Sequence, residues 1–454
     1  MKIKKSIIYL LSFALLLSVT PTNIFAADSA VPQIQSETFV LMDADTGQVL
    51  LERNMGSRIY PASVTKIMTA LLALEKGNLS DTVTMSHDAV WSVGRDTSHV
   101  ALDENEQLTL EEALYALAIE SANDAANGIA ELVGGTMENF AKLMTQRAKE
   151  LGAKTTNFTN AHGLPDANHY TSAYDLALIM AAAVKIPEFT KIFTSVTYSM
   201  PPTNRQPETR TFNRKNSLIE GPYAYEGIIG EKTGWTGDAG YTYIAAANQN
   251  GRTLVAAVIK SPDTNARWED TRALFDYGFF EFVPFGYSAE EFAADKYNIE
   301  FSGGGKSEVK LVPSGDFNCL ISKSAKKEEI KTDYIFFTGE PVGKIEGKAV
   351  FSLKSPSDFM YGILGETDLL IYPADVNPGE IKRAEAKKIN PETESENPES
   401  KILSSVYGVI SVILQIFGII AVVFIILYIR QYKQVQNRKR QKRGYHAGKN
   451  IYKK

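Results

Sequence analysis

One apolar segment near the C-terminal end limits what the rest of the chain can be. Residues 402–429 run for 28 positions without a charged side chain and are rich in Ile, Val, Leu and Phe. A helix of about 20 such residues crosses the hydrocarbon core of a bilayer. We therefore predict a transmembrane helix at 402–429. The tail 430–454 contains Lys and Arg but no acidic residue, so we expect it in the cytoplasm. A tail that binds RNA is the alternative explanation.

The N-terminal end indicates export. Lys2, Lys4 and Lys5 precede the apolar residues 7–19, and small residues follow at Ala26. This order is typical of a secretory signal peptide, which we predict at 1–26. An uncleaved anchor helix is the alternative, although the apolar core is short for a membrane span. Both explanations place the body of the protein, up to about residue 401, outside the cell membrane, and with the signal peptide removed we expect a single-pass membrane protein.

Composition excludes several classes of protein. The 454 residues are 44% hydrophobic and 22% charged, enough for two or three globular domains. A net charge of -5 provides no general basic field for a nucleic acid, which we do not expect as a partner. The single Cys319 rules out an intramolecular disulfide and a zinc site built from several thiolates. The five histidines are scattered without metal-ligand spacing, so we predict no metal and no cofactor.

The order of predicted elements indicates an α+β domain at about 33–281. Residues 39–51 read as two strands around a turn, and 63–76 as a helix that Gly77 ends. Further helices are predicted at 109–119, 124–132, 137–151 and 172–183, then strands at 227–234, 241–247 and 252–259, and a helix at 265–280 that Gly278 could end. Strands at both ends with helices between them predict an antiparallel sheet flanked by helices.

After this domain the pattern changes to short β-type runs. These lie at 309–312, 334–337, 348–353 and 368–372. They predict a small all-β domain at 282–376. Residues 377–401 are rich in Pro, Glu, Lys, Asn and Ser, so we expect a spacer that lifts the globular part from the membrane.

The first candidate for chemistry is Ser63-Val64-Thr65-Lys66. On a helix this spacing brings the hydroxyl and the amine to one face. A serine is a weak nucleophile until a base takes its proton, and a lysine among apolar or cationic groups can lose its own proton and serve as that base. The same spacing recurs at Ser307 and Ser324, both in the β-type region, where residues three apart point to opposite faces of a strand. Only Ser63 opens a predicted helix.

Two further motifs are weak when taken singly. Ser121-Ala122-Asn123 lies between two predicted helices and could be a helix cap, since Ser and Asn are favoured there. Lys232-Thr233-Gly234 occurs once, at the end of a predicted strand, and could be an ordinary turn. The absent side chain of Gly234 would, however, let another backbone come close.

Together and in this order, S-x-x-K, S-x-N and K-T-G resemble the penicillin-binding and serine β-lactamase superfamily. The middle motif departs from S-D-N and is similar to that of the low-molecular-weight D-alanyl-D-alanine carboxypeptidases. Further similarity lies at 41–47, at His162-Gly163-Leu164, at 172–176 and at 267–279. The resemblance covers the chain from about residue 33 to the β domain.

The resemblance implies a serine-type D-Ala-D-Ala carboxypeptidase. It would remove the terminal D-alanine from peptidoglycan stem pentapeptides through an acyl-Ser63 intermediate, and β-lactam antibiotics would acylate the same serine. Lys66 would be the base, Ser121 would relay a proton to the leaving amine, and Asn123 would hold the substrate amide and Lys66. The backbone N–H groups of Ser63 and Trp235 would form the oxyanion hole.

The resemblance also implies which groups receive the terminal carboxylate. Lys232 would supply positive potential, Thr233 a hydroxyl, and Gly234 room for the substrate beside the strand. Arg267 would help through its planar guanidinium, although an ion pair with a neighbouring acid, Glu269 or Asp270, is the alternative. Arg214 would be a supporting residue. Trp235 stands where relatives often have histidine, which leaves its N–H intact but puts a side-chain role in doubt.

Two other functions stay open from the sequence alone. A β-lactamase would use a similar serine, but the membrane span and the second β domain argue against it. A catalytically inactive cell-wall-binding scaffold of the same fold is the other alternative, and the intact Ser63, Lys66 and Lys232 argue against that.

Overall fold

The computed structural model describes residues 31–215, 218–300, 306–337, 345–354 and 362–373. The predicted signal peptide, spacer, transmembrane helix and basic tail all lie outside these ranges. Within them, no helix combines the length and the apolar character needed to cross a bilayer.

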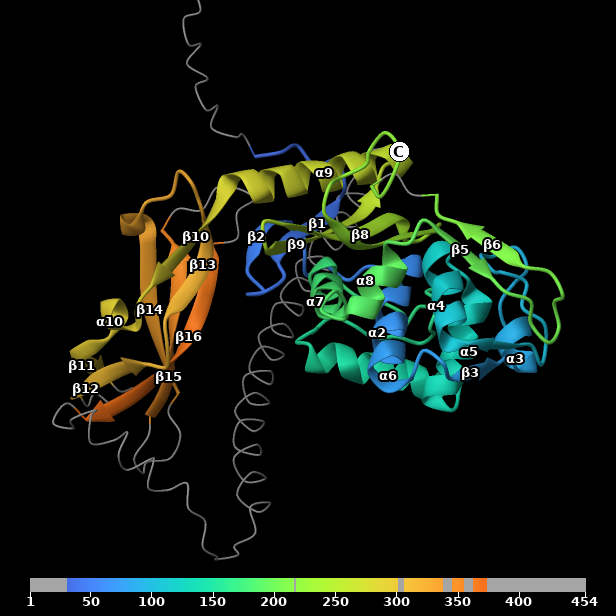
Figure 1. The fold of residues 1–454 in the computed structure, drawn as a ribbon. Helices are drawn as coiled ribbons and strands as arrows, with labels where there is room; N and C mark the ends of the chain where they lie inside the picture. The colour runs from blue at the N-terminus through green and yellow to red at the C-terminus, as the bar shows by residue number, and fades with distance from the viewer. Residues whose placement is uncertain (1–30, 216–217, 301–305, 338–344, 355–361, 374–454) are drawn as a thin grey trace, which may run out of the picture. The chain divides into compact units, whose positions relative to one another are not determined.

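A five-stranded antiparallel sheet forms the centre of the first domain, in the order β2-β1-β9-β8-β7 (Figure 1). Its strands are β1 (Thr38–Asp43), β2 (Val49–Arg53), β7 (Ile228–Thr236), β8 (Gly240–Gln249) and β9 (Arg252–Ser261). Because β1 pairs with β9, the two ends of the domain meet in one sheet, as the sequence predicts. Strand β7 lies at an edge, so one side of its backbone has no partner strand within this sheet.

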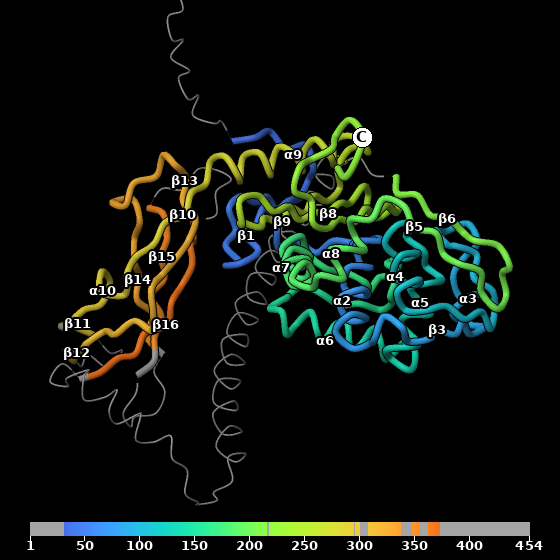
Figure 2. Tube along the Cα trace, in the orientation of Figure 1, coloured from blue at the N-terminus to red at the C-terminus, as the bar shows by residue number. Residues whose placement is uncertain are grey.

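The sheet is covered on both faces. Val40 and Met42 of β1 belong to the larger core beneath the helical layer, whereas Phe39 and Leu41 belong to a second core beneath α9. This alternation follows from the two-residue period of a strand. Figure 2 shows α9 running along one face of the sheet, with α2 and α4 to α8 on the other.

The helical layer matches the helices predicted between residues 63 and 183 closely and contains one more, α8, that the sequence does not predict. Its members are α2 (Lys66–Lys76), α4 (Leu110–Ile119), α5 (Asn123–Gly134), α6 (Met137–Glu150), α7 (Ala173–Ala183) and α8 (Pro187–Phe193). Thr109 caps α4 in a reciprocal pair with Glu112, and Ser172 caps α7. The short elements η1 (Ala62–Thr65), α3 (His87–Trp91), β3 (Thr82–Thr84), β4 (Gln107–Thr109), β5 (Thr197–Met200) and β6 (Arg210–Asn213) complete this side.

Helix α9 (Thr264–Glu281) corrects one expectation. Gly278 lies inside the helix and does not end it. A Cβ on Gly278 would lie 2.7 Å from a side-chain carbon of Leu254 and 2.8 Å from one of Leu41. The glycine therefore lets the helix pack closely on β9 and β1.

The C-terminal described part is rich in strands. One sheet has the order β11-β12-β16-β15-β14, and β10 pairs with β13. The strands are β10 (Phe282–Tyr287), β11 (Ala294–Glu300), β12 (Lys306–Pro313), β13 (Phe317–Ser322), β14 (Ile330–Phe337), β15 (Ile345–Leu353) and β16 (Ile363–Pro373), with the short helices α10 (Ala289–Phe292) and η2 (Lys327–Glu329). The four predicted β segments lie within β12, β14, β15 and β16. Cys319 is buried, and burial raises the pKa of its thiol to about 12.

Candidate active site

Ser63 lies in the short helical turn η1, and Lys66 is the first residue of α2. Ala62, directly before Ser63, has a positive φ of 51°, a conformation that costs energy for a residue with a Cβ. The turn brings the pair together, because Lys66 Nζ lies 3.0 Å from Ser63 Oγ. It also lies 2.7 Å from Asn123 Oδ1 and 2.8 Å from the carbonyl oxygen of His162. The sequence places Ser63 and Lys66 on one face, and the structure shows them in contact.

Lys66 has the electrostatic setting of a base. Its side chain is fully buried, and burial lowers its pKa well below the ordinary value. The charge of Lys232 lowers it further, while Asp124 acts in the opposite direction. A neutral amine has two protons and one lone pair. It can donate to Asn123 and His162 while accepting the proton of Ser63.

The S-x-N motif occupies the connection between α4 and α5. Asn123 opens α5, and its amide nitrogen donates to Thr97 Oγ1 at 3.0 Å, which aims its oxygen at Lys66. Ser121 has a positive φ of 58°, and its buried hydroxyl has no hydrogen-bond partner among the described residues. A strained, unpartnered hydroxyl in a fold is typical of a functional position.

The K-T-G motif lies on edge strand β7, next to Ser63. A Cβ on Gly234 would lie 2.9 Å from the backbone nitrogen of Ser63 and 2.4 Å from Thr242 Oγ1. The glycine is therefore required for the close approach of β7 to η1. Lys232 is buried, donates to the carbonyl oxygen of Thr233 at 3.0 Å, and has a pKa that burial lowers to about 7.

Two arginines were predicted near this strand, and an exposed tryptophan is part of it. Arg267 is 9% exposed, and within the described part of the chain its Nε has no hydrogen-bond partner and its guanidinium forms no ion pair. The alternative, an ion pair between Arg267 and Glu269 or Asp270, is therefore not observed in the described residues. Arg214 is buried and donates through Nε to the carbonyl oxygen of Ser195 at 2.8 Å. Trp235 is 61% exposed, so its side chain lies at the open side of the strand.

Two features of the site escaped reasoning from the residues alone. The carbonyl oxygen of His162 accepts from Lys66, and Gly163, with φ of 88°, lies so close that a Cβ would be 1.9 Å from the oxygen of Ala62. Only the family resemblance points to the His-Gly-Leu segment. Nothing in its composition indicates that His162 contacts Lys66, which lies 96 positions away in the chain. The second feature is Glu231, a fully buried carboxylate beside Lys232.

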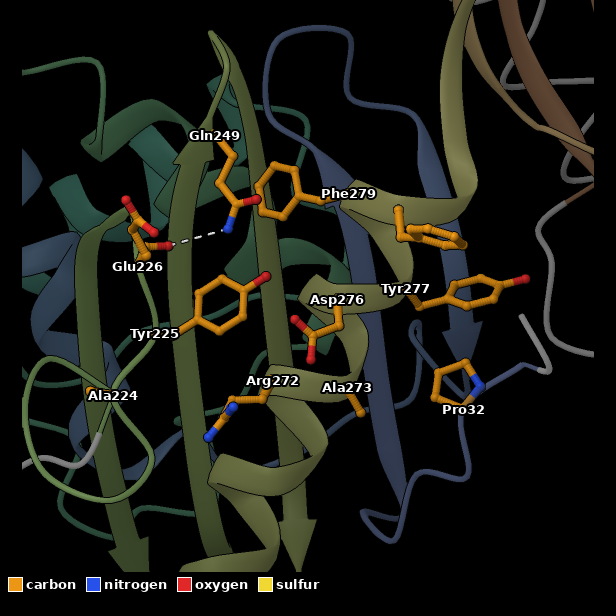
Figure 3. Close-up of a pocket in the computed structure, with 11 residues that line it drawn as sticks. Pro32, Ala224, Tyr225, Glu226, Gln249, Arg272, Ala273, Asp276, Tyr277 and Phe279 are labelled. Atoms are coloured by element: carbon orange, nitrogen blue, oxygen red, sulfur yellow. Dashed lines mark hydrogen bonds between the residues drawn. The ribbon is translucent and has the colours of Figure 1, made fainter. Parts of the chain in front are cut away.

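The described surface has two notable cavities. One of about 200 Å³ is lined by Ser121, Lys232 and Thr233 with Arg214 and Glu231, so it joins the second and third motifs. A larger one of about 780 Å³ lies between α9 and the loop before β7, and it contains none of the predicted site residues (Figure 3). There Gln249 donates to the carbonyl oxygen of Glu226 at 3.3 Å. We assign the chemistry to the smaller cavity, because residues of the second and third motifs line it.

Metal chemistry has no candidate centre in the described ranges. No group of three or more His, Cys, Asp or Glu side chains is arranged there to hold an ion.

The sheet, the helical layer and the Ser63–Lys66 pair define a serine acyl-transfer fold of the penicillin-binding type. Residues 25–263 match the model of the peptidase S11 family, described as D-alanyl-D-alanine carboxypeptidase, and the chain belongs to this family.

Curated relatives agree over most of their length. The chain is 34% identical to D-alanyl-D-alanine carboxypeptidase DacF of Bacillus subtilis, over 66% of this chain and 76% of the relative. It is 32% identical to DacA of Haemophilus influenzae, over 71% and 82% of the two chains. Among solved structures, penicillin-binding protein 5 of Haemophilus influenzae covers 76% of this chain and is covered to 98%, with 29% identity and a TM-score of 0.58.

Proposed function

We propose that this serine-type D-Ala-D-Ala carboxypeptidase removes the terminal D-alanine of peptidoglycan stem pentapeptides through an ester formed on Ser63. One observation carries the proposal: a buried Lys66, with its pKa lowered by burial, in hydrogen-bond contact with the Ser63 hydroxyl. That is the arrangement an activated serine requires.

In the acylation step Ser63 Oγ attacks the carbonyl carbon of the penultimate D-alanine, and Lys66 takes the hydroxyl proton. The backbone N–H groups of Ser63 and Trp235 stabilise the oxyanion, supported by the close approach of Gly234 to Ser63. Lys66 then returns the proton through the Ser121 hydroxyl to the leaving nitrogen as the C–N bond breaks. Ser121 suits this relay because its hydroxyl has no partner in the described structure.

In the deacylation step a water molecule attacks the ester carbonyl carbon. Lys66 takes the water proton and passes it to Ser63 Oγ as the ester bond breaks. The shortened peptide leaves as a carboxylic acid, and the hydroxyl and the neutral amine are restored. The balance needs water alone as the second reactant.

The substrate carboxylate is received by cations beside β7. Lys232 and Arg267 are buried positive groups, and the Nε of Arg267 has no partner in the described structure. A carboxylate of the substrate can accept charge-assisted hydrogen bonds from such groups. Thr233 adds a hydroxyl at the same cavity. The free edge of β7 supports binding of the extended peptide as an added strand.

The enzyme is also proposed to act at the outer face of the cell membrane, anchored by a helix at 402–429 after removal of residues 1–26. The charge-free segment and the basic tail behind it support this topology. This topology is tested by adding protease to sealed vesicles that keep the orientation of the cell membrane. The tail should be protected, and its cleavage in intact vesicles would contradict the proposed topology.

Incubation of the purified ectodomain with a D-Ala-D-Ala peptide and, separately, with penicillin tests the chemistry. Wild type should release D-alanine and retain penicillin on Ser63, which mass spectrometry of peptides locates. Ser63→Ala should do neither, while the matched control Ser307→Ala, at an equivalent spacing to a lysine, should do both. Rapid loss of the penicilloyl group would instead favour the β-lactamase alternative, and no D-alanine release from wild type would favour the inactive scaffold.

A further inference from the structure

Glu231 is a carboxylate with no exposed surface, and it lies outside the three motifs. It precedes Lys232 in β7. One of its oxygens, Oε1, is 3.4 Å from Arg214 Nη1, and the other, Oε2, accepts a short hydrogen bond from the hydroxyl of Tyr243. A buried charge is retained when it is paired and hydrogen-bonded, and both oxygens of Glu231 meet that condition.

The surroundings of Glu231 are strongly cationic. Arg214 follows β6, Lys232 lies on β7 and Arg267 lies on α9, and each of these interacts electrostatically with the Glu231 carboxylate. Tyr243, from the neighbouring strand β8, is the remaining titratable group that faces it. Glu231 is therefore an acidic group that balances three buried cations, of which Arg214 and Lys232 line the small cavity.

The same carboxylate fixes the Arg214 side chain. The guanidinium donates to the carbonyl oxygens of Ser195 and Ile192, at 2.8 and 3.5 Å, and to the Glu231 carboxylate. A planar guanidinium held by several acceptors has one orientation. Without the acid, Arg214 would keep its charge and lose one of the contacts that aim it.

We propose that Glu231 is a positioning residue for substrate-carboxylate binding: held by Arg214 and Tyr243, its charge keeps Lys232 protonated among the surrounding cations. The proposal rests on the assigned role of Lys232 in receiving the terminal carboxylate. The Glu231 side chain has no exposed surface, so Glu231 acts on Lys232 through its charge and does not contact the substrate.

The pKa shifts of Glu231 and Lys232 agree with this arrangement. Burial raises the pKa of Glu231 to about 7, although Arg214 and the Tyr243 hydrogen bond pull it down. Burial lowers the pKa of Lys232 to about 7, and the Glu231 charge opposes that decrease. Loss of the negative charge should therefore let Lys232 release its proton at a lower pH.

Glu231→Gln tests the proposal, because glutamine has the same shape as glutamate but no charge. Its amide oxygen and nitrogen take the places of the two carboxylate oxygens. For a D-Ala-D-Ala peptide, the alkaline limb of the kcat/KM profile should move to lower pH. A shift of one pH unit would reduce kcat/KM by about tenfold on that limb. The decrease in kcat/KM should come mainly from a higher KM and less from a lower kcat. Glu120→Gln is the matched control, since Glu120 lines the same cavity but accepts from the backbone N–H of Asn213 instead.

Tyr243→Phe provides an independent test if Glu231→Gln does not fold. Loss of the hydroxyl raises the pKa of Glu231, so less of the carboxylate is charged near neutral pH and the alkaline limb of the profile should again move to lower pH. D-alanine release and Ser63 acylation by wild type are measured in the same experiment. A failure of the proposed carboxypeptidase function is thereby distinguished from a failure of the proposed role of Glu231. Unchanged pH limbs and KM in a folded Glu231→Gln or Tyr243→Phe protein would overturn the proposal, even if thermal stability fell.

Discussion

The side-chain oxygen of Asn123 lies 2.7 Å from the Lys66 nitrogen, the shortest of the three contacts that this amine makes. The two residues are 57 positions apart in the chain, and each opens a helix. The amide accepts from Lys66 without adding negative charge. It therefore orients the amine and leaves its lowered pKa in place.

Asn123→Asp should shift the acid limb of acylation to higher pH. A carboxylate against Lys66 favours the ammonium form and raises its pKa, so less neutral base is present at pH 7. The rate of Ser63 acylation by penicillin, measured as a function of pH, checks this. Asn127→Asp adds a similar charge one turn further along α5, where Asn127 donates to Ser92, and should shift the limb less. An equal shift in both variants would contradict the assigned contact.

Lys66→Arg should reduce acylation by about 10²- to 10⁴-fold, the usual contribution of a positioned base. Arginine stays protonated and so cannot accept the Ser63 proton as the neutral lysine amine does. Single-turnover acylation with labelled penicillin gives the rate. Lys310→Arg, in the same spacing after Ser307, is the control and should acylate like wild type. A Lys66→Arg protein with near-normal acylation would remove Lys66 from the role of base.

The sequence predicted the sheet, most helices and the three motifs because these depend on local pattern. The period of residues 39–51 and 252–259 indicates strands that a common core then pairs as β1 and β9. Gly278 was misjudged because its reason is tertiary, a close contact with Leu254 and Leu41. Glu231 was missed because a charged residue in a strand is ordinarily exposed, and its partners Arg214 and Tyr243 meet it only in the fold.

Ser121→Gly should be as stable as wild type or more stable, yet slower in catalysis. Glycine adopts the positive φ of 58° without strain, and the buried hydroxyl that is lost has no hydrogen-bond partner in the part of the chain that the structure describes. Relief of such strain stabilises a protein by about 1 kcal/mol. Thermal unfolding and D-alanine release are measured together. Ser121→Ala, which removes the hydroxyl but keeps the strain, should lose the same activity without the gain in stability. A strong loss of stability in Ser121→Gly would show that the hydroxyl has a structural partner.

Gly234→Ala should impair acylation by separating β7 from the nucleophile. The added methyl group would lie 2.4 Å from Thr242 Oγ1 and 2.9 Å from the Ser63 backbone nitrogen, distances at which the strand or the turn must move. Because the oxyanion donors depend on that contact, we expect a loss of about 10²-fold or more in the acylation rate. Gly237→Ala is the matched control, since a Cβ there meets no atom within 4 Å. Normal acylation in a folded Gly234→Ala protein would mean that the approach of β7 to Ser63 does not set the oxyanion hole.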